Sequence, residues 1–170
     1  MALIKTVRGC TPKFGSNCFM ADNATIVGEV VMGDNCTVWF NAVVRGDVHS
    51  ITIGNNTNIQ DGAVIHCTYQ KAKTIIGSNV SIAHNAIVHG CTVHDDVLIG
   101  MGAIVMDDAV IESNSVIAAG AVVLPGTRVE AGSVYGGTPA RRINTTSEEL
   151  KATIQRTAKN YPMYAEWFKE

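Results

Sequence analysis

Residues 93–134 read, six at a time, VHDDVL IGMGAI VMDDAV IESNSV IAAGAV VLPGTR VEAGSV. Each hexapeptide opens with an aliphatic residue, and a small or β-branched residue stands four positions later. An amphipathic helix repeats every 3.6 residues and an ordinary strand every two, so neither explains a strict period of six. Hexapeptide self-similarity is the sequence mark of a parallel β-helix, in which each short strand stacks on its equivalent one coil away.

The same period extends back to Phe14, with departures from the spacing at 48–52 and 67–75 that we predict to be corner loops. The array resembles the left-handed β-helix of hexapeptide-repeat proteins, in which three hexapeptides make one triangular coil. The resemblance implies an all-β fold: a left-handed parallel β-helix domain over residues 1–140, with residues 141–170 as a C-terminal α-helix packed along the prism.

The predicted helix follows a segment rich in glycine and proline at 136–141. Thr146 and Glu149 match a capping box, so the helix is predicted to begin at Thr146. Apolar residues at three-to-four spacing form a stripe suited to the prism surface, namely Leu150, Ile154, Ala158, Tyr161, Ala165 and Phe168. Pro162 is expected to bend or interrupt the helix near Tyr161.

Counting faces on a triangular coil brings two histidines together. Val44, Ile65 and Val88 fall on one face, so the residues that follow them should form an outward column: Arg45, His66 and His89. Neighbours in such a column stand roughly 4.8 Å apart. His66 and His89 can therefore reach one metal ion with bonds of about 2.0–2.1 Å.

His84 lies on the neighbouring face of the coil that carries His89 and is predicted to point around the corner, away from the column. It is poorly placed to complete a site within its own chain. In a three-fold oligomer, one face of each prism meets the next face of its neighbour. We therefore predict a metal held by His66 and His89 of one subunit and His84 of the next.

Four motifs stand in an order much narrower than a hexapeptide array requires: Arg45-Gly46-Asp47, Asn58-Ile59-Gln60-Asp61-Gly62, His66, and His84-Asn85-Ala86-Ile87-Val88-His89-Gly90. Together they resemble the γ-class carbonic anhydrases and their ferripyochelin-binding-protein-like relatives, over about residues 5–143. The resemblance implies a homotrimer with three zinc sites, one at each subunit interface.

Three imidazoles suit a catalytic zinc site, which keeps an open position for water. Zinc lowers the pKa of that water to about 7, so hydroxide is available at neutral pH to attack CO2 and give bicarbonate. Three imidazoles equally suit Fe²⁺ or Co²⁺. The resemblance implies that Gln60 contacts the water or substrate and that Asn58 lies nearby. Arg45 and Asp47 match a pair that the resemblance describes as an ion pair at the subunit interface. A direct catalytic role for this pair is the alternative.

The chain departs from the γ-class pattern where carboxylates are expected. Active γ-class enzymes carry a Glu directly after the Asp of the Arg-x-Asp motif, where this chain has Val48. They also carry a proton-shuttling Glu in the loop after the first histidine, whereas residues 67–73 of this chain contain no Asp or Glu. CO2 hydration is therefore expected to be slow or dependent on buffer, with His49 or Tyr69 as weak substitutes. Away from the column, His49 and His94 are otherwise read as surface histidines.

Composition excludes several classes of protein. The 170 residues carry a formal net charge of −2 and no basic patch, so nucleic acid is not an expected partner. No apolar run of about 18 residues is present, so no membrane span is expected. The N-terminus lacks the order of a signal peptide. Five cysteines without a CxxC pair are read as free thiols, so the predicted location is cytoplasmic.

Three other functions remain open from the sequence. A metal-dependent acyl-CoA thioesterase uses the same metal chemistry on another substrate. A hexapeptide acyltransferase has the same repeat but usually one catalytic histidine, which three ligand-spaced histidines argue against. The third is a metal-binding scaffold without catalysis.

Overall fold

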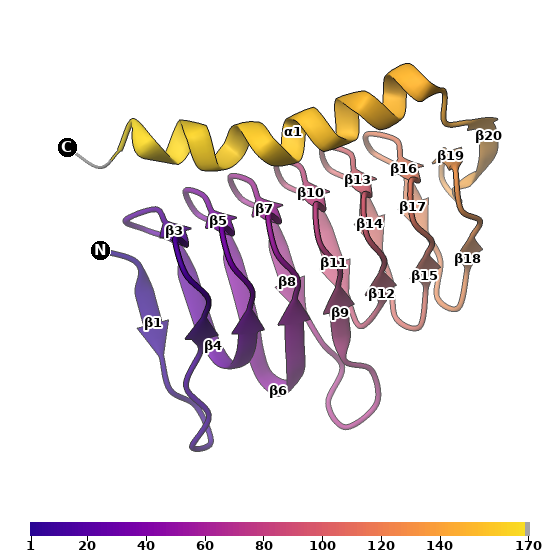
Figure 1. Cartoon of the computed structure of the whole chain (residues 1–170). Helices are drawn as coiled ribbons and strands as arrows, with labels where there is room; N and C mark the ends of the chain where they lie inside the picture. Colours follow the sequence, from indigo (N-terminus) through magenta and orange to yellow (C-terminus); the bar gives the residue numbers. More distant parts are fainter. Residues whose placement is uncertain (169–170) are drawn as a thin grey trace.

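The computed structural model describes residues 1–168 as a parallel β-solenoid of about 7 turns, with one helix, α1 (Glu148–Glu166), lying along it (Figure 1). This confirms the fold class predicted from the hexapeptide period. The strands are β1 (Leu3–Lys5), β2 (Lys13–Phe14), β3 (Phe19–Met20), β4 (Thr25–Met32), β5 (Thr37–Val38), β6 (Val43–Ile53), β7 (Asn58–Ile59), β8 (Val64–His66), β9 (Thr74–Ile76), β10 (Ser81–Ile82), β11 (Ile87–His89), β12 (Thr92–Val93), β13 (Leu98–Ile99), β14 (Ile104–Val105), β15 (Val110–Ile111), β16 (Val116–Ile117), β17 (Val122–Val123), β18 (Arg128–Val129), β19 (Ser133–Gly136) and β20 (Arg141–Thr145).

The strands pair with their equivalents one coil away. One face carries the order β6-β8-β11-β14-β17 and a second carries β6-β9-β12-β15-β18, because long β6 turns a corner and pairs with both β8 and β9. The third face is a separate sheet in the order β20-β19-β16-β13-β10-β7-β5-β3. All pairs along these orders are parallel except β19 with β20.

The first residue of each predicted hexapeptide points into the solenoid. Ile65, Val88 and Ile99 are fully buried, and the rows they belong to form one core made mainly of small and medium aliphatic side chains, with buried thiols. Many corners are tight turns in which asparagine, aspartate or glycine adopts a positive φ; Asn85 (φ 58°) and Asp108 (φ 60°) are examples that carry a side chain. These residues tolerate that conformation because their short side chains form local hydrogen bonds.

The two spacing departures differ in structure. Residues 48–52 were predicted to be a loop, and this is wrong: they are extended and belong to β6, because the chain crosses the corner without a tight turn. In the second departure the chain does leave the coil. It makes a turn closed by a bridge between Thr68 and Ala72 before β9 begins at Thr74.

The predicted helix start is wrong by one residue. Ser147 is the N-cap, and its hydroxyl accepts a hydrogen bond from the Leu150 backbone N–H at 3.1 Å. The Thr146 hydroxyl donates instead to the Asn114 carbonyl. The helix continues through Pro162, which therefore does not end it. Ile154, Ala158 and Ala165 of the predicted stripe are buried, whereas Phe168 is half-exposed.

Candidate metal centre

His66 and His89 pair in register on adjacent coils, as the face counting predicted. Their rings meet edge to face with centroids 5.1 Å apart. His66 Nδ1 and His89 Nε2 are 3.1 Å apart. The register follows from the buried residues before them, since Ile65 lies directly beside Val88.

A carboxylate holds the other nitrogen of each ring. His66 Nε2 lies 3.1 Å from Asp47 Oδ1, and His89 Nδ1 lies 2.6 Å from Asp107 Oδ1. Asp47 also accepts from Arg45 at 2.5 Å. Burial alone would raise the pKa of Asp47, but the hydrogen bonds from His66 and Arg45 outweigh it and hold that pKa below its ordinary value. The His66 ring therefore donates to an ionised carboxylate.

The pKa of Asp107 is lowered in the same way. Burial opposes ionisation, whereas hydrogen bonds from Thr68 and His89 favour it more strongly. The pKa of His66 is lowered, first by burial and further by the nearby Arg45 charge, although Asp47 opposes this. A neutral His66 that donates from Nε2 has a lone pair on Nδ1.

When both rings are neutral, these hydrogen bonds leave two lone pairs facing one another, on His66 Nδ1 and His89 Nε2. Lone pairs at 3.1 Å repel unless a proton or a cation lies between them. Nitrogen ligands about 2.0–2.1 Å from one tetrahedral zinc ion stand about 3.4 Å from each other. The donor set and its spacing therefore fit a metal ion.

His84 has a similar arrangement elsewhere on the coil. It follows β10, and its Nδ1 lies 3.0 Å from Asp61 Oδ2 in a half-exposed pair. His84 opens onto a groove that His89 does not line. Within residues 1–168 of a single chain, no three His, Cys, Asp or Glu side chains are grouped so as to hold a metal ion.

The predicted Asn58 and Gln60 lie with His84 rather than with His66. Gln60 lines the same groove as His84, together with Tyr161 of α1. Gln60 Nε2 donates to Asn58 Oδ1 at 2.9 Å, and Asn58 Nδ2 donates to Ser81 Oγ at 2.8 Å. Both amides are almost fully buried, so this chain of hydrogen bonds fixes their orientation. Burial raises the pKa of Tyr161 to about 12, so its hydroxyl stays protonated at neutral pH.

The seven predicted site residues thus divide into two groups. Arg45 and Asp47 lie with the two histidines of the column. Asn58 and Gln60 lie with His84. Sequence reasoning missed the carboxylate partners Asp61 and Asp107. The register of β11 with β14 makes Met106 the equivalent of His89 on the next coil, so Asp107 lies one residue beyond the column position.

The other two histidines have different surroundings. His94 Nε2 lies 3.7 Å from Glu112, which also pairs with Arg128. His49 Nδ1 accepts a hydrogen bond from the Ser50 backbone N–H at 2.8 Å. In the described part of the chain, neither His49 nor His94 forms a hydrogen bond with His66 or His89. No helix in the described part of the chain is long and apolar enough to cross a membrane.

Known proteins resemble the chain in sequence and in fold. The model of the bacterial transferase hexapeptide family (six repeats) matches residues 90–125. A solved structure of a hexapeptide transferase family protein from Anaplasma phagocytophilum has a TM-score of 0.93 and 38% identity, with 98% of each chain covered. Fold and repeat together define a hexapeptide-repeat protein.

Among hexapeptide-repeat proteins, several curated relatives of the chain are named as carbonic anhydrases. A probable carbonic anhydrase of Methanocaldococcus jannaschii is 43% identical over 88% of this chain and 94% of its own length. Gamma carbonic anhydrase 1, mitochondrial, of Arabidopsis thaliana is 40% identical over 91% of this chain. The chain spans only 58% of the length of that plant relative. The chain belongs to the gamma carbonic anhydrase family.

Proposed function

We propose that the protein is a metal-dependent carbonic anhydrase, a lyase that interconverts CO2 and bicarbonate. One observation carries the proposal: each of the three predicted ligands has one ring nitrogen on an aspartate, in the pairs His66–Asp47, His84–Asp61 and His89–Asp107. A carboxylate on one nitrogen fixes the tautomer and orientation of a histidine that binds metal through the other.

The proposed centre lies between subunits of a homotrimer. His66 and His89 of one chain and His84 of the partner subunit would hold the ion, which brings the two residue groups together. Zn²⁺ is the metal we propose, with Fe²⁺ or Co²⁺ as alternatives. When bound, the metal supplies a hydroxide nucleophile from water at neutral pH.

The protein's own residues prepare the site. Asp47 neutralises Arg45 beside the column, so the guanidinium does not repel a cation there. Gln60, held by Asn58, offers a fixed amide next to His84 for the water or the substrate. The apolar surroundings of these groups suit CO2, which carries no charge.

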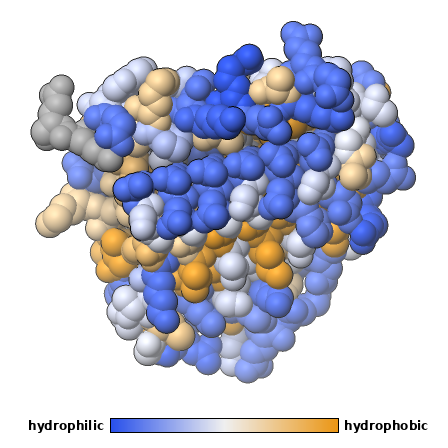
Figure 2. Space-filling view, in the orientation of Figure 1, coloured by the Kyte–Doolittle hydropathy of each residue, from blue (hydrophilic) through white to orange (hydrophobic). Residues whose placement is uncertain are grey.

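The surface of the solenoid supports the trimer. Five aliphatic side chains point outward in register along the face that carries the column: Val43, Val64, Ile87, Ile104 and Val122. On the next face, Leu98, Met101 and Val116 line the groove beside His84. Figure 2 shows apolar surface gathered below α1. Contiguous exposed apolar surface marks an interaction site.

Stopped-flow CO2 hydration by Zn²⁺- and Fe²⁺-loaded protein tests the activity. Hydration that is absent from His89→Ala protein and present in fully metallated wild type supports the proposal. Fully metallated wild type with no activity at any buffer concentration would reject it.

A second candidate is transfer or hydrolysis of an acyl group. The groove beside His84 has a volume of about 430 Å³, far more than CO2 occupies, and its lining is mainly apolar. One similar structure is described as a hexapeptide transferase family protein. A screen of acyl-CoA hydrolysis and transfer on the same metallated protein separates the two candidates.

The cytoplasmic location predicted from the sequence is not supported by the plant relatives, whose names place them in mitochondria.

Metal analysis of protein purified without added metal tests which metal ion the protein binds.

A further inference from the structure

Two turns of the chain adopt a backbone conformation that their residues disfavour. Among the described residues, positive φ at a residue other than Gly, Asn or Asp occurs twice, at Arg8 (φ 52°) and Gln70 (φ 51°). Elsewhere the described residues with positive φ are Asn, Asp or Gly. Strained backbone of this kind gathers at functional sites, because the surrounding structure must impose it.

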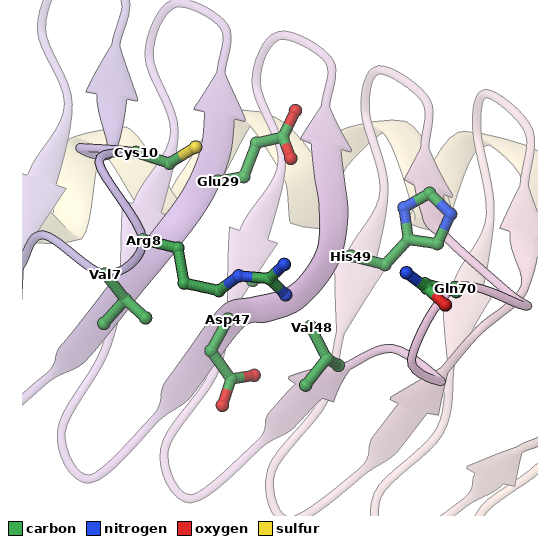
Figure 3. A pocket seen from close by; sticks show the side chains of 9 residues that line it. Val7, Arg8, Cys10, Glu29, Asp47, Val48, His49 and Gln70 are labelled. Atoms are coloured by element: carbon green, nitrogen blue, oxygen red, sulfur yellow. The ribbon is translucent and has the colours of Figure 1, made fainter.

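Both strained residues line one cavity. Arg8 lies in a turn closed by two hydrogen bonds between Val7 and Cys10, each 3.0 Å. Gln70 lies in the turn between Thr68 and Ala72. The cavity between these turns has a volume of about 270 Å³ (Figure 3).

Hydrogen-bond donors border the cavity. In residues 1–168 the Arg8 guanidinium has no carboxylate within 4.0 Å, and it lies over the Tyr69 ring at 5.7 Å. In Figure 3 the guanidinium extends toward Asp47 and Val48, while Gln70 lies beside His49. Since His49 Nδ1 accepts from the Ser50 N–H, the neutral ring carries its proton on Nε2. Arg8, Gln70 and His49 can therefore all donate.

Two acidic residues line the same cavity, Glu29 and Asp47. Asp47 is already engaged by Arg45 and His66. Glu29 makes no ion pair in the described part of the chain and is exposed to solvent. The lining thus combines several donors, one cation without an ion-pair partner and one available acceptor.

We propose that this cavity binds bicarbonate at a second site, apart from the metal centre. The oxygens of the ion accept from Arg8, Gln70 and His49, and its O–H donates to Glu29. An oxyanion that keeps one proton matches this lining better than a fully deprotonated one. Several waters accompany the ion, because one water takes only about 30 Å³ of liquid volume.

The choice of bicarbonate rests on the proposed function, whereas the oxyanion chemistry rests on the lining. Asp47 connects the two sites, since it lines the cavity and accepts from His66 Nε2. A bicarbonate in the cavity is therefore one side chain away from the column. The site would hold the ion beside the centre that forms or consumes it.

The test uses metal-free, full-length protein titrated with ¹³C-bicarbonate and followed by ¹³C NMR, so the metal cannot contribute. We expect saturable binding that Arg8→Gln weakens by about tenfold to hundredfold, as for a lost hydrogen bond to a charged group. Arg156→Gln, on the exposed side of α1, is the matched control and should leave binding unchanged. No saturable binding, or equal effects of the two variants, overturns the proposal.

Two further measurements separate the roles. Gln70→Gly should weaken binding while raising thermal stability, because glycine adopts positive φ without strain. A protein made less stable by Gln70→Gly would contradict the strained turn. Acetate lacks the O–H, so Glu29→Ala should lower the ratio of bicarbonate affinity to acetate affinity. An unchanged ratio rejects the protonated ion.

Failure of this inference is distinct from failure of the proposed function. Bicarbonate binding to metal-free protein is measured independently of CO2 hydration activity. Bicarbonate binding in a protein whose metallated form hydrates no CO2 would reject the carbonic anhydrase activity and leave the oxyanion site standing. CO2 hydration without such binding would do the reverse.

Discussion

His89 Nδ1 and Asp107 Oδ1 lie 2.6 Å apart, the shortest contact between a histidine and a carboxylate in residues 1–168. The other oxygen of Asp107 accepts from the Thr68 hydroxyl at 2.5 Å. Both oxygens are thus engaged, one by the column and one by the turn after His66. The contact fixes which nitrogen of His89 is available, so Asp107 would act as a positioning residue in the proposed metal centre.

Asp107→Asn should therefore weaken Zn²⁺ binding by about 10–100-fold, the usual effect of removing a carboxylate behind a metal-binding histidine. The amide no longer favours the tautomer that leaves Nε2 free. Competition with a chromophoric chelator measures the affinity directly.

Asp108→Asn is the control for this prediction. Asp108 is the next residue, but the described hydrogen bonds give its side chain no histidine partner, and asparagine tolerates its positive φ. Equal Zn²⁺ affinities for the two variants would show that Asp107 does not position His89.

The hexapeptide period predicted much of this geometry. Burial of every sixth residue fixes which side chains share a face, so the register of His66 with His89 followed from counting. The same counting did not reveal Asp107, because the column position one coil after His89 is Met106 and Asp107 lies one residue beyond it. The extended corner at 48–52 was missed for another reason. Irregular spacing indicates that the coil has extra residues there, but it does not show whether they form a loop or an extended strand.

The Arg8 cavity was beyond the reach of sequence reasoning. It forms between a turn before the first coil and a turn after β8, and no repeat relates these two segments.

The sequence did not identify the start of the helix, because Thr146 and Ser147 are both good N-cap residues. Tertiary contact decided between them, since the Thr146 hydroxyl is taken by Asn114.

Subunit mixing tests the shared site. His66→Ala and His84→Ala proteins should each lack intact sites as homotrimers. Mixed trimers should regain some, because an interface can combine the intact column of one chain with the intact His84 of the partner subunit. Metal content and CO2 hydration after subunit exchange measure the recovery. No recovery despite proven exchange would indicate that all ligands come from one chain.

Metal removal should leave the trimer intact. The outward aliphatic row from Val43 to Val122 runs along five coils, so in the proposed trimer we expect apolar burial to hold the subunits together and the metal to add only local links. Sedimentation velocity after chelation checks this. A monomer after chelation would make the metal the main link.

The helix cap gives a prediction on stability. Ser147→Ala should lower the free energy of unfolding by about 0.5–2 kcal/mol, because the Leu150 N–H loses its acceptor. Ser147→Asp keeps an acceptor and should stay near wild type. Urea unfolding at one fixed protein concentration compares them, and a loss for Ser147→Asp as large as that for Ser147→Ala would argue against the cap.

Proton transfer should limit the rate of CO2 hydration. No carboxylate stands at Val48 or in 67–73, and His49 Nδ1 is occupied by the Ser50 N–H, so His49 must give up that bond to take a proton. Hydration should therefore rise with the concentration of imidazole buffer, which acts as an external base.

A carboxylate added to the 67–73 turn should remove much of this dependence. Tyr69 is 54% exposed, whereas Thr68 holds Asp107 and is unsuitable. Tyr69→Glu should raise turnover at low buffer by about tenfold, part of the about 10²–10⁴-fold that a well-placed acid–base group contributes. Tyr69→Gln controls for the lost ring. If wild-type turnover is fast and indifferent to buffer, another group already carries the proton; because Glu29 lies in the same cavity as Val48 and His49, Glu29→Gln is then the variant to measure.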